Sequence, residues 1–379
     1  MKVYKKAILP LGFKANGVAS GIKESGKLDL ALFYSDIPAK AACLFTTNRI
    51  QAAPIQVNKI HLKRGKGYRA IIVNSGNANC FTGESGLRDA QATAKSLAAA
   101  LKIKKENTLV ASTGIIGRRL PLIKIEKAVP ALVKGLSGTG IDKAKRAIMT
   151  TDTFSKEATV KLAIGKNIVT ICGIAKGAGM IAPDMATMLV FIFTDALISQ
   201  MALTRALGAS TDNSFHCITV DGCMSTNDSV MMLANGRAKN TLIDKNGRNF
   251  TVFVQGLQAI CIELAKMIVR DAEGASKFIQ IQVTGAKNFK QARQAALSIA
   301  NSNLFKTAVY GQNPNFGRII AAVGASGIDV REEEIRIRVS PLDRKEIKVD
   351  VSLNRGSACA TVYTSDLTPE YIRINAEYN

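Results

Sequence analysis

The stretch that decides the fold lies near the middle of the chain and reads Lys176-Gly177-Ala178-Gly179-Met180-Ile181-Ala182-Pro183-Asp184-Met185-Ala186-Thr187-Met188-Leu189-Val190-Phe191-Ile192-Phe193. A glycine-rich segment with one lysine passes through a proline turn and reaches a threonine. A wholly apolar run follows at 188–193, and such a run is typical of a strand that is buried on both faces. We therefore expect Thr187 to lie at the mouth of a buried strand.

Outward from this stretch, short β-branched runs alternate with helical stretches rich in alanine and lysine. The alternation predicts strands at 69–73, 108–111 and 278–283, and helices at 86–100, 123–136, 252–270 and 289–301. Two further runs are expected to pair as a hairpin, 335–339 with 347–351. The pattern predicts a mixed α/β fold, with a C-terminal α/β lobe over 279–379 that no low-complexity linker separates from the rest.

Length and composition bound the class of protein. The chain has 379 residues, of which 47% are hydrophobic, so it can bury one large core or two modest ones. The first residues carry lysines around a short apolar stretch broken by Pro10, which is too poor for a secretion signal. No run of about 18 apolar residues occurs, so no membrane-spanning helix is expected. These features predict a cytoplasmic protein that contacts no membrane.

The cysteines and histidines exclude several kinds of site. Seven cysteines are scattered without a C-x-x-C pair, and only His61 and His216 are present. Neither a disulfide framework nor a zinc site of Cys/His spacing is therefore expected. A histidine-based catalytic triad also lacks its base. We expect no metal and no organic cofactor, so the catalytic groups have to be of another kind.

The net charge of +22 is the compositional feature that points to a partner. Lysines and arginines are spread along the whole chain, aromatic residues make up only 6%, and tryptophan is absent. Nucleic-acid surfaces that stack bases interleave cations with aromatic side chains, and no basic stretch here does so. We interpret the charge as a solvated surface that attracts anionic substrates, with nucleic-acid binding as the alternative.

Thr187 can supply the missing catalytic groups if the peptide bond before it is cut. Its new α-amine would then stand beside its own Oγ, which places a base and a nucleophile in one residue. The small side chain of Ala186 leaves room for Oγ to attack the preceding carbonyl, as self-cleavage by an N-to-O acyl shift requires. The alternative is a β-forming threonine whose hydroxyl has only a structural partner.

A second stretch, 108–117, reads as a strand that ends in a turn of hydroxyl and glycine residues. Such a turn can aim the Thr113 hydroxyl and the Gly114 N–H at one point, which is the geometry of an oxyanion hole. A phosphate-binding turn or a plain strand-to-helix turn would have the same glycine spacing. The sequence therefore predicts an oxyanion hole with these alternatives open.

Ordered blocks of sequence run through nearly the whole chain, and together they resemble the ornithine acetyltransferase (bifunctional glutamate N-acetyltransferase) family of arginine biosynthesis. The blocks are Gly12-Phe13-Lys14-Ala15, Phe45-Thr46-Thr47-Asn48, Val73 to Asn79, Ser112 to Gly117, Thr150 to Lys156, Lys176 to Leu189, Val220-Asp221-Gly222, Ser225-Thr226-Asn227-Asp228, Arg270 to Gly274, Tyr310 to Asn315 and Ile374 to Tyr378. The resemblance implies an α/β sandwich of the ornithine acetyltransferase type. It also implies self-cleavage into chains 1–186 and 187–379, which assemble as an α2β2 heterotetramer.

The same resemblance assigns roles to individual residues. It implies cleavage between Ala186 and Thr187, with Thr187 as the acetyl-accepting nucleophile and substrate contact of a ping-pong reaction. Thr113 and Gly114 would form the oxyanion hole. The implied substrates are N-acetylornithine and glutamate, and acetyl-CoA is a further donor that the family uses in its bifunctional members.

The resemblance also implies a set of substrate-binding residues. Lys176 and Glu273 would hold the charged ends of the amino-acid substrate, because a zwitterion needs one cationic and one anionic partner. Thr153 and Asn375 would add hydrogen bonds, and Thr151 is close enough in sequence to replace Thr153. For Lys176 the alternative is a solvated loop lysine.

Four further points qualify the assignment. For Glu273 the alternative is a surface carboxylate paired with Arg270. Asp184 stands where the family often has asparagine, and the chain ends at Asn379, one residue before the family's usual terminal hydroxyl residue. A self-processing amidohydrolase or aminopeptidase would share the threonine chemistry but release the acyl group to water, so it is the alternative enzyme class.

Overall fold

The computed structural model describes residues 1–182 and 188–377, so the predicted cleavage site Ala186–Thr187 lies outside the described residues. The chain divides into two compact units. The first unit comprises Met1–Gly177, the described part of 187–211 and Ser225–Leu264. The second comprises the described parts of 178–186 and 265–379, together with Asp212–Met224. Each unit contains its own sheet and helices, which confirms the predicted mixed α/β fold.

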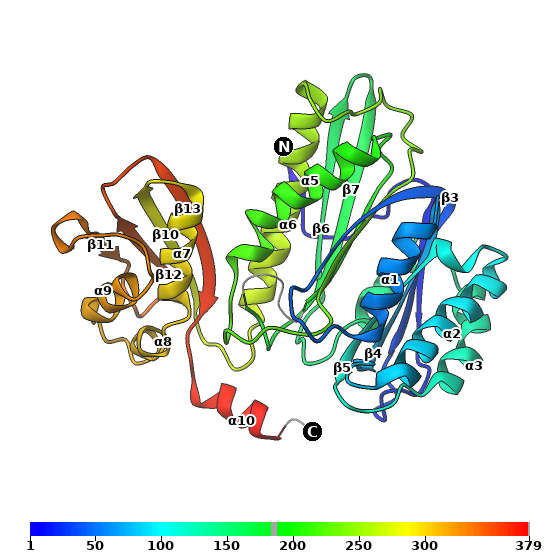
Figure 1. The fold of residues 1–379 in the computed structure, drawn as a ribbon, viewed down its shortest axis with the longest axis horizontal. Coiled ribbons are helices and arrows are strands. Elements are labelled where there is room, and N and C mark those ends of the chain that lie inside the picture. Colours follow the sequence, from blue (N-terminus) through cyan, green and yellow to red (C-terminus); the bar gives the residue numbers. More distant parts are fainter. Residues whose placement is uncertain (183–187, 378–379) are drawn as a thin grey trace. The chain divides into compact units, whose positions relative to one another are not determined.

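The first unit is built on a nine-stranded mixed sheet in the order β1-β6-β7-β8-β9-β3-β4-β5, with β2 paired to β3. Its strands are β1 (Val3–Tyr4), β2 (Phe13–Val18), β3 (Leu30–Phe45), β4 (Tyr68–Asn77), β5 (Thr108–Ile115), β6 (Lys156–Ile164), β7 (Asn167–Lys176), β8 (Leu189–Thr194) and β9 (Ser229–Ala234). The strands predicted at 69–73 and 108–111 are parts of β4 and β5, which run parallel. Figure 1 shows both strands beside helices α1 and α2.

The apolar run that follows Thr187 forms β8, as predicted. All six residues of β8 are buried. The strand is antiparallel to β7 and parallel to β9, so it has a hydrogen-bonded neighbour on each side. Phe191 and Phe193 pack with Phe33, with ring centroids 5.2 and 5.1 Å apart. A strand enclosed on both edges and both faces needs this continuous apolar sequence, because every side chain is removed from water.

Helices cover the first unit's sheet where its strands are apolar. They are α1 (Ala53–Arg64), α2 (Gly83–Leu101), α3 (Leu122–Lys134), α4 (Ile141–Ala147), α5 (Gln200–Asp212) and most of α6 (Arg248–Arg270), with the short η1 (Lys105–Asn107) before β5. The predicted helices 86–100 and 123–136 correspond to α2 and α3. Ile72 and Val110 of the sheet share a buried cluster with Leu97 of α2 and Ile125 of α3.

Helix α6 confirms the amphipathic helix predicted at 252–270. A side chain at Gly173 of β7 would have its Cβ 2.9 Å from Ile260 and 2.8 Å from Leu264, so α6 packs directly on the sheet backbone there. In the part of the chain that the structure describes, α6 is also the one helix whose length and apolar composition would suffice to cross a membrane. The core helix of a soluble protein passes the same test, and 56% of the relevant window is buried.

The second unit carries a four-stranded sheet in the order β11-β12-β10-β13. Its strands are β10 (Phe278–Ala286), β11 (Arg336–Val339), β12 (Glu346–Ser352) and β13 (Ala358–Ser365); its helices are α7 (Phe289–Ala300), α8 (Asn303–Tyr310), α9 (Phe316–Gly324) and α10 (Pro369–Glu377), with η2 (Phe215–Cys217) and η3 (Glu332–Glu334). The predicted hairpin is confirmed, since β11 and β12 pair antiparallel. Ile281, Val349 and Val362 of the sheet share a buried cluster with Ile299 of α7.

Candidate active site

The predicted oxyanion turn lies at the carboxyl ends of the parallel strands β4 and β5, which is where open α/β sheets place their ligands. Thr113 is buried and lies in register with Ser75, and Gly114 lies in register with Gly76. Gly114 has a φ of +131°, and a Cβ there would be 2.4 Å from the carbonyl carbon of Gly76. Only glycine fits this conformation and this spacing, so the turn depends on residue 114 being glycine.

Lys176 is brought to Thr113 from a distant part of the sequence. It is the last residue of β7 and is only 2% exposed, and its Nζ donates a hydrogen bond to Thr113 Oγ1 at 3.3 Å. The alternative of a solvated loop lysine is therefore wrong. A buried cation beside the hydroxyl can bind a carboxylate or stabilise negative charge that develops on an oxygen.

Asp152 connects the lysine to the turn that carries the predicted Thr153. Its Oδ1 accepts from Lys156 Nζ at 2.6 Å and from Gly177 N–H at 2.7 Å. Its side chain and that of Lys156 are fully buried. Burial alone would raise the pKa of Asp152, but the charges of Lys176 and Lys156 and the two hydrogen bonds outweigh it and lower the pKa to about 2.

Thr153 and Thr151 both lie in this turn, which ends where β6 begins. Thr153 is exposed and Thr151 is half-buried. The hydrogen bond from Gly177 to Asp152 fixes the turn beside the end of β7. Both threonines therefore stay candidates for the predicted substrate contact.

Lys23 adds another cation to this cluster. Its Nζ donates to the carbonyl oxygens of Leu28 and Met149, at 3.1 and 2.6 Å. Burial is the main cause that lowers the pKa of Lys23 to about 8, and the nearby charge of Lys176 lowers it further while that of Asp29 opposes the shift. The cluster thus offers cationic side chains to an anionic group.

Asp228 is a candidate site residue that the sequence did not single out by itself, although it ends a recognised block. It is fully buried, and its Oδ1 accepts from the N–H of Met188, the residue after Thr187, at 2.8 Å. Burial raises its pKa well above the usual range, against the hydrogen bond from Met188 and the charge of Lys176. Among the described residues its Oδ2 has no hydrogen-bond partner. Asp228 therefore holds a proton more readily than an ordinary aspartate does.

Replacing Asp228 with asparagine is expected to leave the free energy of unfolding at pH 7 equal or higher. The raised pKa means that folding keeps a proton which the unfolded chain releases above about pH 4, so folding costs more as the pH rises. Asparagine removes this cost and keeps the acceptor for Met188. Urea unfolding at pH 3.5 and pH 7 measures the difference, and the gain should be confined to pH 7. Asp228→Ala, the control, should lose about 1–3 kcal/mol at both values; a loss of stability at pH 7 in the asparagine variant would contradict the assignment.

The second unit holds the other two predicted substrate-binding residues, and it brings them together. Asn375 on α10 donates from Nδ2 to Glu273 Oε2 at 3.0 Å. Glu273 also approaches Gly179, where an added Cβ would lie 2.1 Å from the same oxygen, so a side chain at residue 179 would displace the Glu273 carboxylate from this position. Arg270 pairs with Glu346 at 3.0 Å, which replaces the predicted alternative of a pair with Glu273.

Asp221 anchors the segment that precedes the predicted cleavage site. Its carboxylate accepts from the N–H groups of Met180 and Ile181, at 2.7 and 2.9 Å. The Tyr371 hydroxyl on α10 donates to it as well, at 3.1 Å. The chain is thus fixed by Asp221 before residue 182 and by Asp228 at residue 188, so each side of the predicted junction is held within its own unit.

A buried lysine on a strand-end hydroxyl, with a glycine of positive φ beside it, has the features of an acyl-transfer site. Within the described residues, no group of three or more histidine, cysteine, aspartate and glutamate side chains could hold a metal ion.

Comparison with known proteins gives the family. The chain belongs to the ArgJ family, whose model matches residues 14–343 and 339–379. It is 43% identical to the arginine biosynthesis bifunctional protein ArgJ of Geobacter sulfurreducens, over 97% of this chain and 98% of the relative. It is 46% identical to the protein of that name from Dehalococcoides mccartyi, over 97% and 96%. An ornithine acetyltransferase from Mycobacterium tuberculosis, solved with ornithine, is 40% identical over 48% of this chain and 97% of that chain, with a TM-score of 0.44.

Proposed function

We propose that the protein transfers an acetyl group from N-acetylornithine to glutamate, which gives ornithine and N-acetylglutamate for arginine biosynthesis. The observation that carries the proposal is the buried Lys176 on the hydroxyl of Thr113, at the carboxyl ends of β4 and β5. Membership of the ArgJ family supports the same activity.

The reaction starts with attack of Thr187 Oγ on the acetyl carbonyl of N-acetylornithine, with the α-amine of Thr187 as the base. Thr113 and Gly114 stabilise the oxyanion, and the C–N bond breaks as the leaving amine takes the proton. Ornithine departs and leaves an acetyl-threonine. The glutamate amine then attacks this ester, the C–O bond to Thr187 breaks, and the threonine hydroxyl is restored.

Two charged residues are proposed to recognise the two ends of the amino acids. Lys176, with the cationic cluster around it, binds a substrate carboxylate, and Thr153 adds a hydrogen bond. Glu273 binds a substrate ammonium group, and Asn375 holds the Glu273 carboxylate in place.

The chain is proposed to become active by cutting itself between Ala186 and Thr187. The products, residues 1–186 and 187–379, would assemble as an α2β2 heterotetramer in the cytoplasm. The mechanism uses no metal and no organic cofactor, and acetyl-CoA is proposed as a second acetyl donor.

The acetyl-enzyme is the intermediate that tests this function. Purified protein incubated with N-acetylornithine, without glutamate, is expected to gain the mass of one acetyl group on the fragment that begins at Thr187. Intact mass spectrometry after acid quenching measures it, with ornithine as the control ligand. Glutamate should then remove the acetyl group as N-acetylglutamate. If the enzyme-bound acetyl group is instead lost rapidly as acetate in the absence of glutamate, the result would favour the amidohydrolase. If no acetyl group is found on the protein, the result would argue against covalent transfer.

A further inference from the structure

Two hollows follow one another along the seam between helices α1 and α2 of the first unit. The inner hollow, of about 380 Å³, is lined by residues at the amino-terminal ends of both helices and just before them. The outer hollow, of about 320 Å³, is lined by residues further along both helices and by η1. Along α1 the lining runs from Ala53 to Arg64, which is about 16 Å of helix.

The inner hollow begins at the loop next to the oxyanion turn. Ala78 N–H donates to the carbonyl oxygen of Ile115 at 3.0 Å, and Gly117 N–H donates to that of Cys80, also at 3.0 Å. These bonds join the loop after β4 to the end of β5, where Gly114 lies. The seam therefore starts beside the proposed site of acetyl transfer.

Phe81 presents an aromatic ring at this end of the seam. It lines the inner hollow, is 80% exposed, and has a φ of +58°, which a bulky side chain rarely adopts. Ile50 lines the same hollow and is 59% exposed, so two large apolar side chains stand exposed in a lining that also contains charged and polar residues. Neither side chain is needed in the core, and their exposure suits contact with a ligand.

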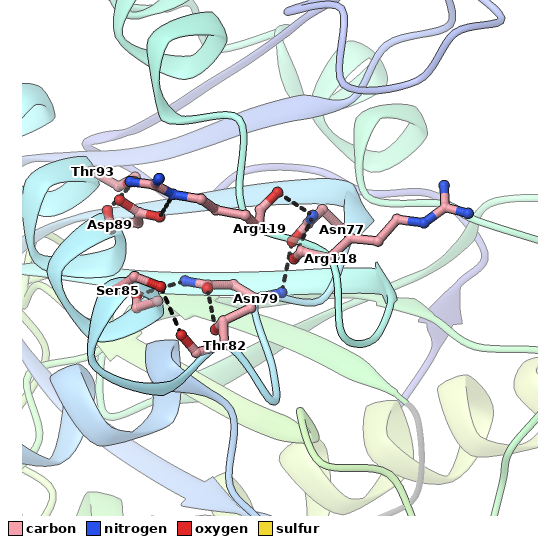
Figure 2. Close-up of polar contacts among 9 residues, drawn as sticks. Asn77, Asn79, Thr82, Ser85, Asp89, Thr93, Arg118 and Arg119 are labelled. Atoms are coloured by element: carbon pink, nitrogen blue, oxygen red, sulfur yellow. Dashed lines mark hydrogen bonds and ion pairs between the residues drawn. The ribbon is translucent and has the colours of Figure 1, made fainter.

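A polar network fixes the loop that carries Phe81, and Figure 2 shows the hydrogen bonds of this network. Asn79 donates to the carbonyl oxygen of Gly86 at 2.9 Å and accepts from the Thr82 hydroxyl at 3.0 Å. Asn77 Nδ2 donates to the carbonyl oxygens of Arg118 and Arg119, each at 3.1 Å. The loop is thus fixed on both sides of Phe81, and a costly backbone conformation persists where its surroundings impose it.

The outer hollow is strongly cationic. Four exposed side chains line it, Arg64, Arg88, Lys95 and Lys105, against the single carboxylate of Glu106. Arg88 also pairs with the exposed Glu84 of the inner hollow at 3.3 Å.

A buried histidine lines the outer hollow and is held by a hydrogen bond. This residue, His61, is 5% exposed, and its Nδ1 lies 2.7 Å from the carbonyl oxygen of Thr108, which makes Nδ1 the donor. Guanidinium and ammonium groups bind phosphate oxygens, and several of them around one hollow suit a ligand that carries more than one negative charge.

The two hollows together would fit a ligand that has an acyl group at one end and phosphates at the other. An extended arm with apolar parts would join these two ends. We propose that the α1–α2 seam binds the coenzyme A portion of an acetyl-CoA donor, with the arm along Phe81 and the phosphates at Arg64, Lys95 and Lys105. The inference rests on the proposed function, because it places the thioester beside the oxyanion turn.

The chemical step balances with the groups that the proposed function already uses. Thr187 Oγ attacks the thioester carbonyl, the C–S bond breaks, and the sulfur leaves as the thiol with the proton that Oγ gives up. The resulting acetyl-threonine is the one formed from N-acetylornithine. Only the binding of the donor's leaving group differs between the two reactions.

The test is the triple variant Arg64→Gln, Lys95→Gln, Lys105→Gln. Its KM for acetyl-CoA in glutamate acetylation is expected to rise about tenfold or more, because three charge contacts to phosphate are lost. Its KM for N-acetylornithine should change less than about twofold. S-acetylpantetheine carries none of the phosphates, so its KM should be the same in variant and parent.

A matched control removes three other exposed lysines of the chain, with Lys134→Gln, Lys166→Gln and Lys290→Gln. An equal rise in the acetyl-CoA KM in this control would reduce the effect to net charge and overturn the inference. An unchanged KM in the seam variant would overturn it too. Calorimetry with free coenzyme A gives a readout without turnover: failure of the parent protein to bind it refutes the inference, while transfer from N-acetylornithine would still stand.

Discussion

Replacing Thr187 with alanine is expected to leave the protein as one uncut chain of 379 residues and to reduce acetyl transfer at least about 10⁴-fold. The substitution removes the hydroxyl that the proposal uses twice, first to cut the bond after Ala186 and then to accept the acetyl group. Denaturing mass spectrometry reads the first effect, and release of ornithine from N-acetylornithine reads the second.

Thr187→Ser is the matched variant, because it keeps a hydroxyl at the same position. It should still cut itself and retain measurable transfer. The proposed mechanism fails if the alanine variant is found in two fragments, or if it transfers acetyl at a rate near that of the parent.

Replacing Asp152 with asparagine is expected to lower the free energy of unfolding by about 3 kcal/mol at pH 7. The change removes the carboxylate partner of Lys156 where both side chains are fully buried, and breaking a buried pair on one side is strongly destabilising. Lys176 loses a neighbouring negative charge as well. Urea unfolding of the parent and the variant measures the loss.

The pH dependence of this effect has a definite sign. Since the folded pKa of Asp152 is lowered to about 2, its contribution is complete above the ordinary value near 4 and is lost as the pH falls toward 2. The two proteins should therefore converge in stability at low pH. Asp142→Asn is the control, because Asp142 is exposed and its partner Lys145 keeps a second carboxylate, Glu157, so the loss should cost no more than about 0.5 kcal/mol. Equal losses in the two variants would contradict the role given to Asp152.

The elements of the fold follow closely from local sequence patterns. The strand after Thr187 has an unbroken apolar run, and the helix at 252–270 has its apolar residues at helical spacing; both are present, as β8 and as α6. Burial dictates these patterns one element at a time. The pairing of β7, β8 and β9 depends on contacts between distant segments, and no local pattern encodes it.

The candidate site could be predicted from the sequence less completely than the helices and strands. The sequence pointed to Thr113 and to Lys176, but their hydrogen bond joins residues 63 positions apart. The partners Asp152 and Asp228 were missed as functional residues. An isolated aspartate in a sequence usually indicates an exposed, solvated side chain. Asp152 precedes Lys156 by four residues within one recognised block, and that spacing was the available signal.

The strand order has a consequence for the two proposed products of self-cleavage. Strands β8 and β9, which belong to the later product, lie between β7 and β3 of the earlier one. Six residue pairs join β7 to β8 and six join β3 to β9, so the products share ladders on both sides. Neither product could leave the other without opening the middle of a sheet. If the chain is cut as proposed, the two products would therefore have to fold together before the cut and would remain associated after it.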